Sequence, residues 1–275
     1  MTFVRHHLSD GLFAKFRDLV HSQTGVFLMP EDRELLSSRL ARRLRHCRFA
    51  TCGEYFSYLE NDQSGQELGE LLNCIASSFS RFFRGKDHFD YLAGVVLPGF
   101  HDRSGNKVFR AWSAVCGAGE ESYSLAIVLK EFQAANPGFR FTINATDISS
   151  KVLAQARQGV YNLDRLADMP KDLLRRYFRR GTGPMAGFFK VKAEMLQAVR
   201  FQRFSLAGRF PGQGGFDLVF CRNAMLYFSE EFQQELLVKL HRCLRPGGHL
   251  MVGQRESLPT IGSSFKRVGP SAYQK

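Results

Sequence analysis

The sequence predicts an α/β protein: a small all-helical N-terminal domain, then an open, mostly parallel, Rossmann-like sheet that carries a small antiparallel β insertion. From Lys107 to Ser124 an apolar run ends at a Gly-x-Gly turn, and a helical pattern follows. That order of strand, turn and helix is how an open α/β sheet presents a nucleotide-like ligand. Upstream, residues 10–90 show only helical spacing of apolar residues. We therefore expect a helical domain over residues 1–90 and the sheet domain over 91–275, with the insertion at about 179–206.

Composition restricts the kinds of partner. The 275 residues carry a formal net charge of +12 at pH 7, which favours an anionic partner: nucleic acid, a membrane surface or an acidic protein. The chain lacks a run of roughly 18 apolar residues that could span a membrane, and its N-terminus lacks the apolar core of a signal peptide. The six cysteines are scattered without a C-x-x-C pair, so we expect reduced thiols in a cytoplasmic protein and no metal site.

The N-terminal domain contains a strongly basic helix. From Glu31 to Arg48, the residues Leu36, Leu40 and Leu44 recur every four positions on one face. Basic residues occupy much of the remaining surface of that helix: Arg39, Arg42, Arg43, Arg45, His46 and Arg48. Charge alone fits a solvated face and a docking surface for an acidic partner equally well.

The sheet domain alternates strands and helices on both sides of the insertion. In chain order we expect a strand over 108–115, a strand over 141–146, a helix over 151–158, a short helix over 170–178, a strand over 216–221, a helix capped by Ser229 and a strand over 249–253. Asp147 follows the second of these strands directly.

The insertion is marked by residues that forbid a regular element: Gly181, Gly183, Pro184 and Gly187. Beyond them, Phe188–Val191 and Val199–Phe204 alternate between apolar and polar residues. We interpret both segments as antiparallel strands of the insertion.

The residues around Gly117 and Gly119 restrict the class of ligand that the loop can bind. Asp147 lies 28 residues after Gly119 at the end of the next strand, where an acid can accept hydrogen bonds from both ribose hydroxyls of NAD or of S-adenosylmethionine. A dinucleotide site would need a third glycine, but Glu120 and Glu121 follow instead. Two carboxylates at a helix N-terminus repel a pyrophosphate and suit the ammonium of a methionine moiety. The loop therefore favours S-adenosylmethionine over a dehydrogenase cofactor.

Asn223 and Tyr227 lie just beyond the strand over 216–221, again at a carboxyl end. Asn223 is also explained as a local cap, and Tyr227 as a half-buried aromatic with its hydroxyl in water. Arg84 lies in the segment SFSRFFRGKDHF (78–89), which fits a packed linker between domains or part of a site. The residues alone leave these alternatives open.

The chain resembles the CheR-type chemotaxis receptor methyltransferases nearly end to end, from about Ser9 to Tyr273. The matching segments occur in the order of the family: TGVFL (24–28), SSRLARRL (37–44), SFSRFFRGKDHF (78–89), RAWSAVCGAGEESYSLAI (110–127), ATDIS (145–149), GVY (159–161), RGTGPMAG (180–187), FDLVFCRNAMLYF (216–228) and LRPGGHLMVGQRES (244–257). The resemblance implies a class I S-adenosylmethionine-dependent methyltransferase fold and O-methylation of glutamate side chains on chemotaxis receptors, with S-adenosyl-L-homocysteine as product.

The resemblance also implies roles for particular residues. It places these cofactor contacts at the carboxyl edge of the sheet: Ser78, Ser80, Arg84, Gly117, Gly119, Glu120, Asp147, Ser205, Leu206, Arg222 and Asn223. It places Tyr227 near the transferred methyl group, with Arg84 as a second orienting group. For receptor docking it implies the basic helix with Arg39, Arg42, Arg43 and Arg45, and strand addition of a receptor C-terminal peptide along the insertion with Gly181, Gly183 and Gly187. We expect a monomer that binds neither nucleic acid nor the membrane directly.

Some positions depart from the family pattern. Ser78 and Ser205 stand where the family usually has Asn, and a serine hydroxyl cannot replace both ends of an amide. Cofactor affinity is therefore expected to be lower, which leaves a second hypothesis: a catalytically weak receptor-binding adaptor that still holds cofactor or product. A nucleic-acid or small-molecule methyltransferase is a third, permitted by the charge. Because the ribose acid, the glycine loop and Tyr227 are all present, we expect an active enzyme.

Overall fold

The fold was analysed in a computed structural model of the chain. It describes residues 8–24, 28, 30, 33–62, 67, 70–71, 81–104, 107–210, 215–222, 224–225, 228, 230–254, 256, 264–269 and 271–275. The chain divides into two compact units: Met1–Phe79 with Leu226–Ser229, and Ser80–Met225 with Glu230–Lys275. We call them the helical unit and the sheet unit.

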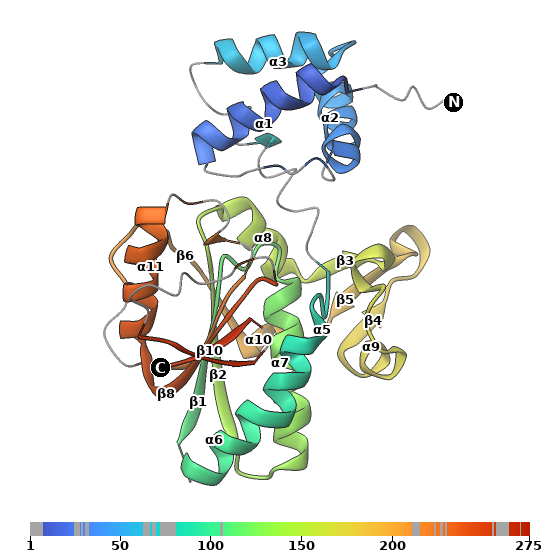
Figure 1. Ribbon diagram of the computed structural model, residues 1–275. Coiled ribbons are helices and arrows are strands. Elements are labelled where there is room, and N and C mark those ends of the chain that lie inside the picture. Colours follow the sequence, from blue (N-terminus) through green and yellow to red (C-terminus); the bar gives the residue numbers. More distant parts are fainter. Residues whose placement is uncertain are drawn as a thin grey trace. The chain divides into compact units, whose positions relative to one another are not determined.

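The helical unit contains α1 (Asp10–Thr24), α2 (Arg33–Cys47) and α3 (Cys52–Asn61) (Figure 1). Its core forms where the apolar stripes of these helices meet, and fully buried members include Phe16, Leu36, Leu40, Leu44 and Tyr55. Thr51 caps α3 by accepting a hydrogen bond from the Glu54 amide, which satisfies one of the free N–H groups at the helix start. The predicted helical domain and its leucine stripe are confirmed.

One predicted docking residue on α2 lies on the wrong face. Arg43 follows Leu36 by one heptad, so the two residues are only about 20° apart around the helix. The side chain of Arg43 is 12% exposed and pairs with Glu67, with Nη2 2.6 Å from Oε2. Arg43 is therefore part of the interior of the helical unit, and the prediction that it belongs to the docking surface is wrong. Arg42 and Arg45 are exposed, as predicted, and Arg39 is half-buried.

The sheet unit is built on seven strands in the order β6-β2-β1-β7-β8-β10-β9. The strands are β1 (Val108–Ala114), β2 (Arg140–Asp147), β6 (Val199–Arg203), β7 (Phe216–Cys221), β8 (Leu244–Val252), β9 (Lys266–Gly269) and β10 (Ala272–Gln274). All neighbours from β6 to β8 pair in parallel, whereas β10 is antiparallel to both β8 and β9. The predicted open, mostly parallel sheet is confirmed, while β9 and β10 are strands that the sequence interpretation missed.

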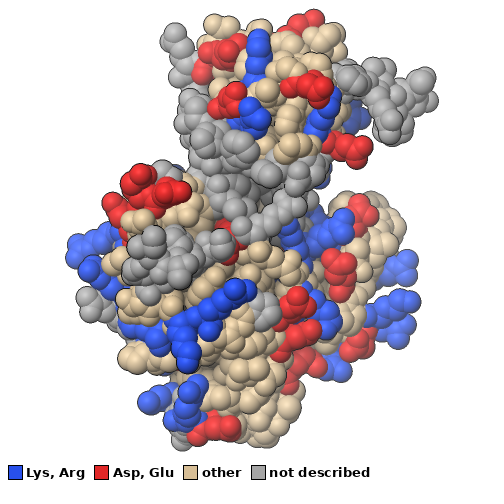
Figure 2. Space-filling view, viewed as in Figure 1, with Lys and Arg blue, Asp and Glu red and all other residues tan. Residues whose placement is uncertain are grey.

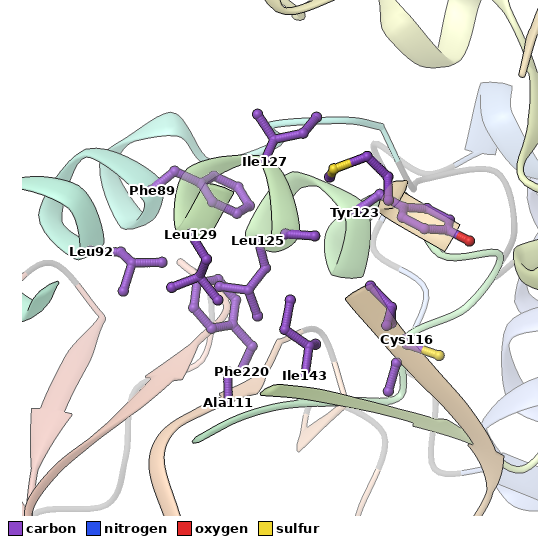
Figure 3. Close-up of a cluster of buried hydrophobic side chains, with 14 of the residues drawn as sticks. Phe89, Leu92, Ala111, Cys116, Tyr123, Leu125, Ile127, Leu129, Ile143 and Phe220 are labelled. Atoms are coloured by element: carbon purple, nitrogen blue, oxygen red, sulfur yellow. The ribbon is translucent and has the colours of Figure 1, made fainter. Parts of the chain in front are cut away.

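Helices cover both faces of this sheet. Figure 1 shows α11 (Glu230–Cys243) on one side and α7 (Glu120–Ala135) on the other, the latter beside the helical segment α5 (Lys86–Tyr91), η2 (Leu92–Val96) and α6 (Leu97–Ser104). Under α7 the core consists of apolar side chains from α7, the helical segment and the central strands, as Figure 3 shows for Phe89, Leu125, Leu129, Ile143 and Phe220 among others. This packing fixes the start of α7 against the carboxyl end of β1.

The β insertion differs from the prediction. It is a three-stranded antiparallel sheet in the order β3-β5-β4, formed by Val160–Asn162, Phe188–Val191 and Phe178–Arg180 respectively. The segment predicted as its second strand, Val199–Phe204, instead supplies β6, which pairs in parallel with β2 at the edge of the large sheet. The helix α10 (Ala193–Ala198) returns the chain to that edge. Alternation of period two is common to both kinds of strand, so the pattern could not separate them.

Candidate active site

Four strands of the sheet unit end side by side. In the parallel register Ala114 of β1 lies opposite Thr146 of β2 and Cys221 of β7, and Asp147 lies opposite Arg203 of β6. Parallel strands have their carboxyl ends at one edge, so the segments that follow them converge there. Three features therefore lie close together at that edge: the glycine loop, Asp147 and the start of the segment after β7.

The glycine loop turns sharply at this edge. Gly117 and Gly119 have φ of 54° and 97°, in the left-handed region that glycine occupies without strain. A Cβ on Gly119 would lie 3.0 Å from the Tyr161 hydroxyl oxygen and from Ala156 Cβ, whereas a Cβ on Gly117 would meet nothing within 4 Å. The second glycine is therefore required by close packing, and the first leaves backbone accessible beside the loop.

Asp147 is bonded directly to this loop. Its Oδ2 accepts a hydrogen bond from the Gly117 amide at 3.0 Å, and its Oδ1 accepts one from the Ser149 amide at 2.9 Å. Burial raises the pKa of Asp147, an effect that these backbone donors oppose. Each carboxylate oxygen can accept a further hydrogen bond. The arrangement is a fixed, buried acceptor of the kind that a pair of ribose hydroxyls would use.

Glu120 begins α7 and is 1% exposed. Its Oε1 is 3.0 Å from Nη1 of Arg165, which belongs to the 3-10 helix η3 (Leu163–Leu166) next to β3. The same part of the insertion provides Tyr161, whose hydroxyl donates to the Ala118 carbonyl at 2.6 Å. The insertion therefore holds the glycine loop at two points, and it orients the Glu120 carboxylate.

Glu121, the next residue, has different partners. Its Oε1 accepts a hydrogen bond from the Ser113 hydroxyl at 2.8 Å, and its Oε2 lies 3.5 Å from Nη1 of Arg222. Burial raises the pKa of Glu121, and the positive charges of Arg222 and Arg84 oppose that rise. The two adjacent glutamates thus connect the loop to two different parts of the sheet unit.

Ser205 and Leu206, predicted to contact the cofactor, are brought to Asp147 by β6. The Phe204 amide donates to the Asp147 carbonyl at 3.0 Å, and the two predicted residues follow directly. Leu206 is 6% exposed, and the Ser205 hydroxyl accepts a hydrogen bond from the Ala207 amide at 3.3 Å.

Arg84 and Arg222 lie together at the same edge. Arg84 is half-buried, and its carbonyl accepts a hydrogen bond from Nη2 of Arg222 at 2.6 Å. The remaining predicted site residues lie outside the described residues: Ser78, Ser80, Asn223 and Tyr227.

Sequence reasoning missed the two residues by which the insertion contacts the loop. Tyr161 stands in the GVY motif, which gave no role for it, and Arg165 lies in a segment without any motif. Neither position carries a local signal, because their function comes from a contact 43 to 45 residues away in the chain.

The candidate docking residues of the insertion form its β4–β5 turn. Gly181 donates its amide to the Phe188 carbonyl at 2.8 Å, and a Cβ on Gly181 would lie 2.2 Å from the Met185 carbonyl oxygen. Gly183 and Gly187 have φ of 56° and 87°. These glycines shape the hairpin whose outer strand, β4, is an edge of the small sheet.

The surface charge is dispersed. Figure 2 shows basic side chains over both units on the face in view, interspersed with acidic ones rather than gathered in one patch. Within the described ranges, no cluster of three or more His, Cys, Asp or Glu side chains could hold a metal ion. Among the helices described, none is long and apolar enough to cross a membrane.

The chain is similar to known proteins over nearly its whole length. Residues 78–273 match the family model "CheR methyltransferase, SAM binding domain", and residues 12–76 match "CheR methyltransferase, all-alpha domain". The chain is 35% identical to the chemotaxis protein methyltransferase of Escherichia coli strain K12, covering 97% of this chain and 91% of that protein. It is 36% identical to chemotaxis protein methyltransferase 2 of Pseudomonas aeruginosa, covering 97% and 94%, and 34% identical to that of Borreliella burgdorferi, covering 94% and 91%. The chain belongs to the CheR methyltransferase family.

Proposed function

We propose that this chain is an S-adenosylmethionine-dependent methyltransferase of chemotaxis receptors, and that it methylates the side-chain carboxylate of receptor glutamates. The observation that carries the proposal is the pair of buried carboxylates, Asp147 and Glu120, on either side of the Gly117–Gly119 turn. The negative charge of Glu120 at the start of α7 disfavours a pyrophosphate, and the two carboxylates together fit a cofactor with ribose hydroxyls and an ammonium group.

The residues present fit S-adenosylmethionine. Asp147 is buried and bonded to backbone amides, yet each oxygen keeps acceptor capacity for a ribose hydroxyl. Glu120 would hold the ammonium, and Gly117 leaves space where any other residue would carry a Cβ. Ile148, directly after Asp147, is 62% exposed, an apolar surface suited to the adenine ring.

The proposed reaction needs little acid–base catalysis from the protein. When bound, the cofactor supplies a methyl group that passes to a carboxylate oxygen, with S-adenosylhomocysteine as the other product. The acceptor glutamate is already ionised at neutral pH, because its reference pKa is about 4.3. The residues of this chain therefore act by holding the two reactants and excluding water from the acceptor carboxylate. Arg84 and Tyr227 are our candidates for orienting that carboxylate.

Receptor docking is proposed for one surface in each unit. In the helical unit, Arg42 and Arg45 are exposed on α2 and can attract an acidic receptor segment. In the sheet unit, the edge strand β4 can pair with an extended peptide from the receptor. On this proposal the basic helix of the expected domain 1–90 serves docking, and methyl transfer takes place in the sheet unit, which contains Arg84 as well as most of the expected domain 91–275.

The test is methylation of receptor-bearing membranes by the purified protein with methyl-labelled S-adenosylmethionine. We expect base-labile label on the receptor, mapped by mass spectrometry to glutamates, and loss of label when those glutamates are replaced by alanine. Label that resists base would contradict a carboxyl ester. Cofactor binding without transfer would instead identify an adaptor, and transfer to RNA in the absence of receptor would identify a nucleic-acid methyltransferase.

A further inference from the structure

The segment 81–85 at the edge of the sheet unit is held in an unusual backbone conformation. Phe83 has φ of 54°, a value uncommon for a residue with a side chain, and Gly85 has φ of 71°. Arg84 lies between these two left-handed residues. Such conformations are strained for a non-glycine residue and persist only where the surroundings enforce them. Contacts with neighbouring groups must therefore hold the backbone of this segment.

Three hydrogen bonds connect the segment 81–85 to other parts of the sheet unit. The Phe82 amide donates to the Arg165 carbonyl at 3.0 Å, and the Phe83 amide donates to the Ser124 hydroxyl at 2.9 Å. The Arg84 carbonyl accepts from Nη2 of Arg222 at 2.6 Å. Within the segment, the Arg84 amide also donates to the Arg81 carbonyl at 3.4 Å. The bond from Arg222 ties the main chain of Arg84 to another element, and it depends on how the guanidinium of Arg222 is oriented.

Arg222 is fixed by its surroundings. Its side chain is 6% exposed, and its guanidinium carbon lies 5.8 Å from the ring centroids of both Phe89 and Phe220. Its Nη1 faces Oε2 of Glu121 at 3.5 Å. A planar guanidinium can bind a carboxylate and a carbonyl at the same time through different nitrogens. The single ammonium group of a lysine cannot reproduce that geometry.

Gly85 is matched to this arginine. A Cβ on Gly85 would lie 2.5 Å from Nη2 of Arg222, closer than real Cβ contacts, so any other residue there would displace the guanidinium or the loop. Two independent features, a strained backbone and a missing Cβ, therefore serve the same contact between Arg222 and the main chain at Arg84.

We propose that Glu121 is a positioning residue: it orients Arg222, which in turn fixes the main chain at Arg84 so that the Arg84 side chain is presented at the active-site edge. Glu121 is itself held by the Ser113 hydroxyl at 2.8 Å. Its role thus differs from that of the adjacent Glu120, which faces the insertion. The inference deepens the proposed function, on which it rests, because it assigns to Glu121 the placement of a proposed catalytic group.

A buried pair of this kind is a weak source of stability, because desolvation of two charges offsets their attraction. Its value here lies in geometry, since a displacement of about 1 Å at a catalytic group can cost on the order of 100-fold in rate. A positioning role therefore predicts a specific kinetic pattern. Loss of Glu121 should reproduce the kinetic defect of losing the Arg84 side chain, and the two defects should not add.

The experiment compares Glu121→Gln, Arg84→Met and the double variant in the receptor methylation assay. We expect each single variant to lose at least tenfold in kcat/KM with the same division between kcat and KM, and the double variant to be no worse than Arg84→Met alone. Additive losses would overturn the proposal, as would a Glu121→Gln enzyme with wild-type kinetics.

Gly85→Ala provides a second route if Glu121→Gln does not fold, because it leaves Glu121 and Arg222 chemically intact and disturbs only their contact with the loop. Gly138→Ala is its matched control: Gly138 has φ of 96°, so alanine is strained there too, but its Cβ would meet nothing within 4 Å. We expect Gly85→Ala to lose at least tenfold in kcat/KM, without further loss on adding Arg84→Met, and Gly138→Ala to keep wild-type kinetics. Equal kinetics for the two glycine variants would overturn the proposal.

Failure of the proposed function would look different. If the wild-type protein transfers no methyl group to any receptor glutamate, the proposed function fails, and calorimetric affinity for S-adenosylmethionine becomes the readout for the same variants. Non-additive losses of affinity for Glu121→Gln and Arg84→Met would then still support the positioning role, and additive ones would still overturn it.

Discussion

The helical unit and the sheet unit each contain a largely buried pair of arginine and glutamate, and the pKa values of the two glutamates are shifted in opposite directions. Glu67 accepts two hydrogen bonds from Arg43, at 2.9 and 2.6 Å, and a third from the Tyr55 hydroxyl at 2.7 Å. Burial tends to raise the pKa of Glu67, but these donors outweigh it and the pKa is lowered. At Glu121, by contrast, burial dominates, because the approach of Arg222 at 3.5 Å is weaker, and the pKa of Glu121 is raised.

The difference separates a pair that stabilises the helical unit from carboxylates whose charged form is disfavoured by burial. Asp147, the proposed ribose acceptor, resembles Glu121 because burial raises its pKa too. A raised pKa does not mark a site by itself, since burial also raises that of Asp217, which pairs with Arg245 at 3.0 Å at the start of β7. What distinguishes Asp147 and Glu121 is the combination of a raised pKa with a place beside the glycine loop.

The sharpest test of the stabilising role is Glu67→Gln. The amide leaves Arg43 buried without its charge partner, and breaking a buried pair costs about 3–5 kcal/mol. Because each side chain keeps 12% of its exposure, we expect a loss near the lower end, about 3 kcal/mol in the opening free energy of the helical unit. Hydrogen exchange of peptides from α2 and α3 measures this unit separately, since a chain of two units need not unfold in one step.

The control for that variant is Asp18→Asn, which breaks the pair between Arg17 and Asp18, 32% and 68% exposed. A surface pair contributes between about 0 and 1 kcal/mol, so we expect almost no change in exchange. Similar losses for both variants would show that Arg43 and Glu67 are no more than a surface pair, and the contrast between the two units would disappear.

The corresponding amide substitution in the sheet unit, Asp147→Asn, should do the reverse. Hydrogen bonds to a charged acceptor contribute about 1.5–3 kcal/mol, so we expect the Kd for S-adenosylmethionine to rise by about 10- to 100-fold. The stability of the sheet unit should change little at neutral pH, because loss of the buried charge offsets the contact of the new amide NH2 with the N–H of Gly117 or Ser149. Calorimetry measures the affinity, and Asp102→Asn on the exposed surface of α6 is the control. An unchanged Kd would contradict the ribose assignment.

These contrasts also show what the sequence could predict. The meeting of Asp147 with the glycine loop followed from topology, because the carboxyl ends of adjacent parallel strands lie at one edge. The position of Arg43 could have been predicted from its heptad spacing to Leu36, but its partner Glu67 lies beyond a turn and a further helix. Likewise, the contact of Arg165 with Glu120 depends on how the insertion folds back. Long-range pairs of side chains leave no local pattern.

The family resemblance supplied roles that the residues alone left open, for example the choice between a cap and a cofactor contact for Asn223. It also assigned Arg222 to the cofactor, whereas the structure uses both of its terminal nitrogens within the protein, toward Glu121 and the Arg84 carbonyl. The cofactor contact of Arg222 stays a prediction, and the contacts of its side chain support the separate proposal that Arg222 helps to position Arg84.

A smaller effect is expected where the helical unit exposes its arginines. Arg42 and Arg45 are exposed on the same helix as Arg43, so they are available to a partner. We expect Arg42→Gln with Arg45→Gln to reduce the initial rate of receptor methylation by about fivefold at low salt, and by less at high salt, because exposed charges act through screened attraction. The Kd for S-adenosylmethionine should not change. Arg140→Gln, an exposed arginine at the start of β2, is the control. If Arg140→Gln slows methylation equally, Arg42 and Arg45 act only through the overall positive charge of the protein and not as a docking surface.

The smallest effect, and the one that returns to the two kinds of carboxylate, is the pH dependence of the amide variants. The folded pKa of Glu67 is lowered, so its contribution to stability is present above the unfolded pKa of about 4.3 and is lost as the pH falls through the lower folded value. The cost of Glu67→Gln should therefore be constant from pH 7 to about pH 5 and shrink only in stronger acid.

Asp147 has the opposite sign. Its folded pKa is raised, so the folded state binds a proton more tightly than the unfolded state, and ionisation on going to neutral pH costs stability. The amide of Asp147→Asn avoids that cost, so relative to wild type this variant should be favoured most at neutral pH. The advantage should shrink as the pH falls through the raised pKa and the wild-type carboxylate protonates. Hydrogen exchange of β2 peptides between pH 7 and pH 4 measures it against the Glu67→Gln series. Difference curves with the same sign and the same onset would contradict this contrast. As the pH rises, stability increases where the folded pKa is lowered, as for Glu67, and decreases where it is raised, as for Asp147.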